Sequence, residues 1–259
     1  MQSILWKKGM YEMSEELIIG RNPVVEALKS GRSVNKVMVS EQVNQRTQRQ
    51  LEELSKKAGT IVQKVPKSRL TQLSDGNHQG VVAYVAAYQY ASLENLFERA
   101  DECGEAPFFI ILDELEDPHN LGSILRTVHA TGAHGVIIPK RRSVGLTAAV
   151  AKTSAGAIEH VPVVRVTNIV DVIDELKERN VWIVGTEAEG TEDYRSLDGE
   201  TSIALIVGNE GRGMGRLVKD SCDWTVSLPM KGQVSSLNAS VASSLLLYEV
   251  YRKRHPLEK

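Results

Sequence analysis

The fold of this chain depends on one stretch, SIALIVGNEGRGMGRLVKDSCDWTVSLPMKGQVSSLNASVASSLLLYE (Ser202–Glu249). Its apolar run Ile203–Val207 is typical of a buried strand, and the glycine-rich turn Gly208–Gly215 follows it directly. A second strand is expected over Trp224–Leu228. Serine and asparagine then open a long helix over Asn238–Arg254, because both residues commonly cap helices. This order of elements indicates an α/β fold.

The same alternation extends upstream and predicts a parallel sheet. The expected strands are Phe108–Leu112, Gly135–Ile138, Val161–Val166 and Val181–Gly185, and the expected helices are Asn120–Thr131, Thr147–Ala155 and Asp171–Arg179. Continuous apolar strands that alternate with helices are typical of a parallel sheet covered on both faces. Ligands of such sheets bind beyond the carboxyl ends of the strands. A functional site is therefore expected in the segments that follow the strands.

The first third of the chain predicts a separate, smaller α/β unit over residues 17–88. Its expected elements are a helix at Val24–Ser30, a strand at Lys36–Ser40, a helix at Gln45–Ala58, a strand at Thr60–Val65, a polar loop at Pro66–Asn77 and a last strand in GVVAYVAAY. Residues 1–16 show no pattern and are expected to form a loose tail. The acidic, weakly helical residues 89–106 are expected to be a linker, and residues 107–259 the larger domain.

Composition narrows the functional classes. The 259 residues carry a net charge of −2, and no apolar run is long enough to cross a membrane. Cys103 and Cys222 are too few for a disulfide framework or a zinc site, so we expect a cytoplasmic protein without a metal. The segment from Asn44 to Arg69 contains seven basic residues and only two acidic ones. Such a run is either a solvated surface or a local phosphate-binding face.

The glycine-rich turn argues against a dinucleotide site. Its spacing in Gly208–Gly215 is G-x-x-G-x-G-x-G, which matches neither G-x-G-x-x-G nor a phosphate loop that ends in GK[ST]. No acidic residue ends the strand Trp224–Leu228, where a ribose would be held. A nicotinamide-dependent oxidoreductase is therefore the weaker interpretation.

Two other segments carry candidate side chains. In DELEDPHNLGSILRT, Asn120 could cap the expected helix, and Arg126 follows six residues later. Taken alone, this segment is equally well a capped helix with one solvated arginine. In SLPMKGQVSSLNASVASS, Leu228 and Met230 supply an apolar wall before the polar start of the last helix.

Together, the three segments resemble a known family. The patterns N-x-G-x-x-x-R, VGNEGRGM and LPM-x(5)-SLN-x-S-x-A, in this order, resemble the three signature motifs of the SpoU (TrmH-type) branch of the SPOUT RNA methyltransferases. The resemblance covers roughly Pro107–Arg254. IIGRNPVVEAL and HQGVVA resemble the L30e-like substrate-binding domain of several members. The whole chain looks closest to the bacterial 23S rRNA guanosine 2′-O-methyltransferases of the RlmB type.

The resemblance implies a fold, a cofactor and partners. It implies a catalytic α/β domain whose C-terminal part forms a deep trefoil knot, a homodimer, S-adenosylmethionine as cofactor and 23S rRNA as the substrate. The cofactor would be held by loops at Thr186–Ala188, Gly208–Gly211 and Leu228–Leu237. The residues carried over as cofactor-binding are Thr186, Gly208, Leu228, Met230 and Leu237.

The resemblance also implies roles for polar side chains. Arg126 matches an essential arginine that would act as the base or as a positioning group, since a free guanidinium has a pKa above about 12. The residues expected to orient Arg126 and the ribose are Asn120, Glu210, Ser236 and Asn238. The expected RNA contacts are Arg46, Arg49, Lys64, Lys67, Arg69 and Arg141. A tRNA or adenosine target remains an alternative, as does an RNA-binding protein without activity.

Overall fold

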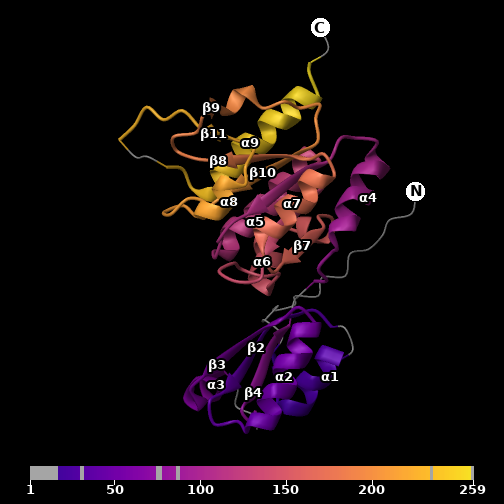
Figure 1. The fold of residues 1–259 in the computed structure, drawn as a ribbon, viewed down its shortest axis with the longest axis vertical. Helices are drawn as coiled ribbons and strands as arrows, with labels where there is room; N and C mark the ends of the chain where they lie inside the picture. Colours follow the sequence, from indigo (N-terminus) through magenta and orange to yellow (C-terminus); the bar gives the residue numbers. More distant parts are fainter. Residues whose placement is uncertain (1–16, 30–31, 74–77, 86–87, 234–235, 258–259) are drawn as a thin grey trace, which may run out of the picture.

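The computed structural model describes residues 17–29, 32–73, 78–85, 88–233 and 236–257. The expected tail, residues 1–16, lies outside this described part. The chain folds into two α/β units that lie one beyond the other, with the N-terminal unit separate from the larger one (Figure 1). Among the described residues, no helix is long and apolar enough to cross a membrane.

The N-terminal unit is a four-stranded sheet with helices packed on it. The sheet order is β1-β4-β2-β3, in which β2 and β3 are parallel and the other pairs antiparallel. The elements are β1 (Leu17–Ile19), α1 (Arg21–Lys29), β2 (Val34–Ser40), α2 (Gln45–Lys57), β3 (Ile61–Val65), α3 (Lys67–Leu73) and β4 (Val81–Val85). Helix α2 begins where Asn44 Oδ1 accepts the Thr47 N–H at 2.9 Å, and Leu51 anchors it in the core.

Two predictions for this unit were wrong. The first helix begins at Arg21 rather than at Val24, so Asn22 and Pro23 lie inside its first turn. The segment Pro66–Asn77 is not a plain loop, because α3 forms there and buries Leu70 against the sheet. A single apolar anchor in a polar stretch is too weak a pattern to predict a helix. Residues 74–77 of this segment lie outside the described part of the chain.

The larger unit is a seven-stranded sheet in which every pair is parallel, as the sequence predicts. Its order is β7-β6-β5-β10-β8-β11-β9. The strands are β5 (Phe108–Leu112), β6 (Gly135–Pro139), β7 (Val163–Val166), β8 (Trp182–Thr186), β9 (Glu192–Asp193), β10 (Ile203–Val207) and β11 (Trp224–Ser227). The helices are α4 (Leu93–Cys103), α5 (Pro118–Thr131), α6 (Ala148–Thr153), α7 (Ile169–Glu178), α8 (Arg216–Asp220) and α9 (Ala239–Arg254), with short 3-10 turns at Ala157–Glu159 and Tyr194–Ser196.

Helices cover both faces of this sheet, which confirms the expected layers. On one face α5 and α9 pack Leu125 and Leu246 over Ile110 of β5. On the other face α4 and α7 pack Phe97 and Ile173 into a second core. Alternate residues of β5 therefore point into different cores, which explains its uninterrupted apolar sequence.

Residues 89–106 were expected to be a linker, but most of them form α4 and belong to the core of the larger unit. Ser92 and Asn95 form a reciprocal capping box, and Gly104 ends the helix in the left-handed region. Leu96 and Phe97 are buried, and the Phe97 ring meets that of Phe109 edge to face at 5.1 Å. The acidic residues of this segment occupy the solvated face of the helix and obscure its apolar side in the sequence.

Other differences are small. The expected helix Thr147–Ala155 is shorter, because Ala155 and Gly156 adopt positive φ and end it. Helix α8 and strand β9 were not predicted, since each is too short to show a period. Most remaining boundaries shift by one or two residues.

Candidate active site

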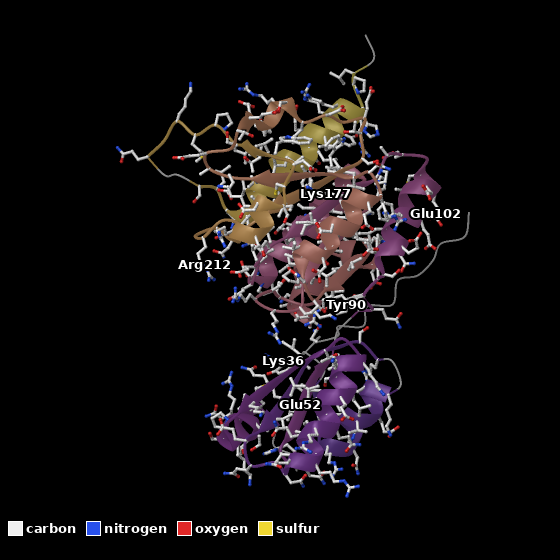
Figure 2. All side chains as sticks on the ribbon, in the orientation of Figure 1. Lys36, Glu52, Tyr90, Glu102, Lys177 and Arg212 are labelled. Carbon is white, nitrogen blue, oxygen red and sulfur yellow. The ribbon has the colours of Figure 1, made fainter. Side chains whose placement is uncertain are left out.

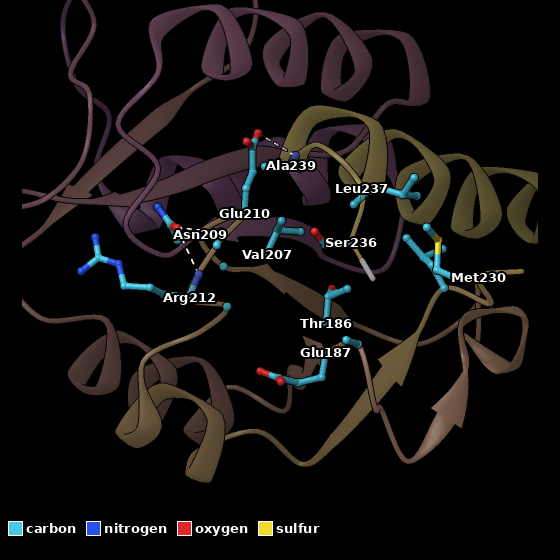
Figure 3. Close-up of a pocket in the computed structure, with 16 residues that line it drawn as sticks. Thr186, Glu187, Val207, Asn209, Glu210, Arg212, Met230, Ser236, Leu237 and Ala239 are labelled. Carbon is cyan, nitrogen blue, oxygen red and sulfur yellow. Dashed lines mark hydrogen bonds between the residues drawn. The ribbon is translucent and has the colours of Figure 1, made fainter. Parts of the chain in front are cut away.

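The candidate site lies at the carboxyl ends of the central strands, where the parallel sheet predicts it. Strands β8 and β10 are neighbours, and the segments that follow them face a third segment that leads into α9. These three segments enclose a cavity of about 550 Å³ (Figure 3). The residues that line it are Thr186–Ala188, Val207–Gly213, Leu228, Met230, Ser236, Leu237, Ala239 and Ala242. Its size is that of a small-molecule site.

All five residues expected to bind the cofactor line this cavity, although they come from three separate segments. Leu228, Met230 and Leu237 give it an apolar wall. On the opposite side, the hydroxyl oxygen of Thr186 is shielded from water and has no hydrogen-bond partner among the described residues. Glu187 lines the same side, and its carboxylate lies 3.3 Å from Lys219 Nζ. An unpaired polar atom beside an apolar wall fits a ligand with both apolar and hydrogen-bonding parts.

The glycine-rich turn is a tight loop that only glycine permits at two positions. Asn209 and Gly213 exchange backbone hydrogen bonds of 3.0 and 2.8 Å. A Cβ at Gly208 would lie 2.3 Å from the backbone of Gly213, and Gly213 itself has a φ of +68°. The Asn209 side chain accepts hydrogen bonds from the Gly211 and Arg212 N–H groups inside the loop (Figure 3). The glycines thus allow the backbone to line the cavity.

Glu210 joins three segments that are far apart in the sequence. Its Oε1 accepts a hydrogen bond from the Ala239 N–H at 3.0 Å (Figure 3). The same oxygen accepts from Asn120 Nδ2 at 2.9 Å and from Asn238 Nδ2 at 2.6 Å. Asn238 Nδ2 also donates to Asn120 Oδ1 at 3.0 Å. The structure therefore brings together three of the five side chains expected to be catalytic.

The two asparagines have different local roles. Asn238 caps α9, since its Oδ1 accepts the Ser240 and Val241 N–H groups, and its amide nitrogen remains for Glu210. Asn120 was expected to cap α5, but this expectation was wrong. Asp117 caps that helix by accepting the His119 N–H, and Asn120 lies buried in the first turn, pointing to Glu210.

The other two side chains expected to be catalytic, Arg126 and Ser236, differ in whether they line the cavity. Ser236 is exposed and lines the cavity. Arg126 is exposed on α5 and does not line the cavity. Its guanidinium has no hydrogen-bond or ion-pair partner within the described part of the chain. An unpaired arginine on the helix that carries Asn120 is available to bind an anion from solution.

The sequence did not predict the contacts that hold the glycine loop against the end of β5. Asp113 is buried at the end of β5, and its Oδ2 accepts the Gly215 N–H at 2.8 Å. Burial raises the pKa of the Asp113 carboxyl above its ordinary value, and the hydrogen bond from Gly215 partly opposes this. The Asn209 side chain donates to the carbonyl of Glu114 at 3.2 Å. Part of the signal was available, because acidic residues follow β5 and the carboxyl ends of parallel strands are where a site is expected.

The expected RNA contacts are spread over the N-terminal unit. Arg46 and Arg49 lie on α2, Lys64 on β3, and Lys67 and Arg69 on α3. Arg141 lies in the loop after β6 and lines a cavity between the two units. None of the six lines the cavity beside Glu210. The described residues contain no group of three or more His, Cys, Asp or Glu side chains that could hold a metal ion.

Two family descriptions match this chain. The SpoU rRNA Methylase family matches residues 107–248, which contain the cavity, the Glu210 cluster and Arg126. The RNA 2′-O ribose methyltransferase substrate binding family matches residues 17–91, the N-terminal unit.

Similar proteins match over nearly the whole length. YacO of Bacillus subtilis (strain 168), named as a TrmH family tRNA/rRNA methyltransferase, is 57% identical over 93% of this chain and 97% of its own. A similarly named protein of Staphylococcus aureus (strain MSSA476) is 51% identical over 94% and 98%. The crystal structure of the SpoU methyltransferase AviRb from Streptomyces viridochromogenes, in complex with the cofactor AdoMet, is similar with a TM-score of 0.59 and 28% identity. It covers 92% of this chain and 89% of AviRb.

Proposed function

The chain belongs to the SpoU rRNA methylase family, and we propose on this basis that it methylates a ribose 2′-hydroxyl in structured RNA with S-adenosylmethionine. The observation that carries the proposal is the cavity of Figure 3, with its apolar wall, the unpaired Thr186 hydroxyl and the Glu210 cluster beside it. An RNA partner also supports a cytoplasmic location.

The residues that line the cavity fit S-adenosylmethionine. Leu228, Met230 and Leu237 would pack against the adenine, and backbone groups of the glycine loop would approach the ligand closely. The Thr186 hydroxyl and the Glu187 carboxylate would take hydrogen bonds from its polar parts. When bound, the cofactor supplies a methyl group on a sulfonium centre, whose positive charge makes the sulfur a good leaving group.

The protein then has to orient the hydroxyl and help its proton to leave. A bond forms between the 2′-oxygen and the methyl carbon, and the carbon–sulfur bond breaks. We assign Arg126 to the phosphate beside the reacting ribose, because a guanidinium holds its proton tightly and is a poor base but a good phosphate ligand. That phosphate can accept the hydroxyl proton. Asn120, Glu210 and Asn238 hold the start of α5 against the start of α9, and Ser236 faces the cavity beside them.

The RNA class is the finer part of the proposal. A substrate-binding unit at residues 17–91 supports a structured RNA, and the names of the relatives include both tRNA and rRNA. We propose a guanosine of 23S rRNA, as in enzymes of the RlmB type, with a tRNA or adenosine target as the alternative. Methylation of total RNA from a deletion strain with labelled cofactor, followed by mapping of the nucleotide, decides between them.

We also propose that the chain is knotted and dimeric. Contacts of Glu210 with Asn238 and Ala239 tie the glycine loop to the start of α9, which supports a knotted C-terminal segment. Val241, Leu245 and Tyr248 follow one face of α9 and are 48%, 42% and 50% exposed, which supports a second copy packed there. A crystal structure tests the knot, and sedimentation velocity of the full chain tests the dimer.

Arg126→Ala tests the assignment of roles. We expect it to reduce methyl transfer to total rRNA roughly 10²- to 10³-fold, while S-adenosylmethionine binds with unchanged affinity. His129→Ala, an exposed change one turn further along α5, is the control and should retain activity. Near-normal turnover of Arg126→Ala contradicts the assignment.

Two outcomes with the wild-type protein would favour another function. Binding of NAD in place of S-adenosylmethionine would favour an oxidoreductase, and RNA binding without any turnover would favour a non-catalytic RNA-binding protein.

A further inference from the structure

The two units are joined by a polar contact in addition to the chain itself. The Tyr90 hydroxyl donates to Asn35 Oδ1 at 2.6 Å and accepts the Leu146 N–H at 2.9 Å. Arg165 of β7 donates to the carbonyl of Asn35 at 2.8 Å and to that of Val34 at 3.4 Å. This joint, defined by Asn35, Tyr90 and Arg165, ties β2 of the N-terminal sheet to the larger sheet. Tyr90 lies where the two units meet (Figure 2).

Two cavities flank the joint and share Lys140 and Arg165. The larger one has a volume of about 820 Å³, and its other cationic residues are Lys36, Arg141 and Arg142. The smaller one has a volume of about 540 Å³, and its other cationic residues are Lys29, Arg32 and Lys57. We call the two together the interdomain groove. Lys36 and Tyr90 mark its position in Figure 2.

The charge of the groove is one-sided. Eight cationic residues line it, and among the described residues Glu116 is the one carboxylate that does so. Two of the eight are paired with carboxylates outside the lining, Lys29 with Glu26 and Arg142 with Glu114. The chain as a whole has a net charge of −2, so the groove departs strongly from the average surface. Burial, and secondarily the charge of Arg165, lowers the pKa of the Lys140 ammonium. Partly desolvated cations crowded together in this way create a positive potential that favours an anion.

The groove and the candidate active-site cavity both lie beyond the carboxyl ends of strands of the larger sheet. Lys140 follows β6, and the cavity of Figure 3 lies beyond β10. β6 and β10 are separated by β5 alone, so two strand spacings, about 10 Å, separate their carboxyl ends. Helix α5, which carries Arg126, begins between them after β5. A single polynucleotide can therefore occupy both places.

We propose that the interdomain groove binds the phosphate backbone of the RNA substrate, and that the joint holds the two units at the spacing this backbone needs. The inference rests on the proposed function. It differs in part from the expected RNA contacts. Arg141 lines the groove, as does Lys57 of the basic run, whereas the other five expected contacts, Arg46, Arg49, Lys64, Lys67 and Arg69, do not. Lys36 and Lys140 are its central contacts, one from each unit.

The test compares two double substitutions in the full chain. Lys36→Gln with Lys140→Gln removes one groove charge from each unit. Lys56→Gln with Lys152→Gln removes the same charge from exposed positions on α2 and α6 that do not line the groove. The affinity for a fluorescein-labelled 20-nucleotide RNA hairpin is measured by anisotropy between 50 and 200 mM salt. S-adenosylmethionine binding is measured on the same samples to show that the cavity is intact.

We expect the groove variant to bind the hairpin roughly tenfold more weakly at 50 mM salt. The magnitude of its slope of log affinity against log salt should fall by about 1.4 to 1.8, as for two lost phosphate contacts, and the control should match the wild type. Equal weakening of both variants, or of neither, overturns the proposal. So does unchanged hairpin binding by the groove variant together with lost binding of poly-glutamate, which would indicate an acidic protein partner.

The binding assay contains no methyl transfer, so the two proposals fail separately. A wild type that binds RNA in a groove-dependent way but never methylates it refutes the proposed function alone. A wild type that methylates rRNA, with a groove variant that binds and methylates equally well, refutes the groove alone.

Discussion

The active-site cavity and the interdomain groove are both assembled from distant segments, but by different means. The cavity takes its residues from the carboxyl ends of neighbouring strands in one parallel sheet. The groove takes its residues from two sheets that have separate cores. Sheet order dictates which segments meet at the cavity, whereas at the groove the two units meet through contacts such as those of Tyr90 and Arg165 with Asn35. The first arrangement follows from topology, and the second depends on a few polar contacts.

Among the changes that bear on this comparison, Glu210→Ala at the cavity is expected to have the largest effect. The change removes the acceptor that Asn120, Asn238 and the Ala239 N–H share. A shift of about 1 Å in the start of α5 or α9 can reduce a rate about 10²-fold, so with two elements affected we expect kcat to fall roughly 10²- to 10³-fold. Single-turnover methylation of rRNA measures this. Glu210→Gln, which keeps one acceptor, should recover part of the rate, and an unchanged kcat in both variants would remove the cluster from the mechanism.

The contrast also explains what could be predicted from the sequence. The cofactor set and the Glu210 cluster follow strand ends, so the parallel order alone brings Asn120, Glu210 and Asn238 to one edge. The same reasoning extends to Asp113, which follows β5 and accepts the Gly215 N–H, but the sequence analysis did not predict this contact. Of the groove, the sequence predicted Arg141 as an RNA contact. The pairing of the two units was not predictable, since no local pattern shows that Asn35 faces Arg165. A basic run along the chain is a poor guide to which cations share a surface.

The second prediction concerns the pH dependence of the larger unit. His134 is fully buried at the amino end of β6, and its Nδ1 accepts the Phe108 N–H at 3.0 Å. Burial, reinforced by the charge of Arg254, lowers its pKa from 6.5 to about 4. The unfolded chain therefore binds a proton between pH 6.5 and 4 that the folded chain does not, so stability falls as the pH is lowered through this window. The loss should reach about 3 kcal/mol at pH 4.

Denaturant unfolding at pH 7 and at pH 4.5 measures this loss, with His134→Asn as the comparison. Asparagine can accept the Phe108 N–H but does not titrate, so the variant should lose much less stability on acidification. The same pH dependence in both proteins would assign the acid sensitivity to other groups. Because His134 lies far from the joint, this effect separates the stability of the larger unit from the contact between units.

The smallest effect is expected at the joint, from Tyr90→Phe. The change removes the hydroxyl that bonds Asn35 and the Leu146 N–H but keeps the ring. We expect KM for RNA to rise roughly tenfold with little change in kcat, because the units lose a fixed spacing while the cavity remains intact. Steady-state kinetics with rRNA measures the split. Tyr88→Phe, the same change two residues earlier, is the matched control. A fall in kcat alone would show that the joint acts on the cavity instead.

Helix α4 has a practical consequence for dividing this protein. The two family matches cover residues 17–91 and 107–248, and residues 92–106, which contain α4, fall between them. A fragment of the larger unit that starts at 92 keeps α4, whereas one that starts at 107 lacks it. A fragment starting at 107 would uncover Phe109 and Ile111, which Leu96 and Phe97 shield. It would also leave the edge of β7 bare where Ala91 now bonds Val163. A fragment of the larger unit that keeps these apolar side chains covered therefore has to start no later than Ala91, and one that starts sixteen residues later should aggregate.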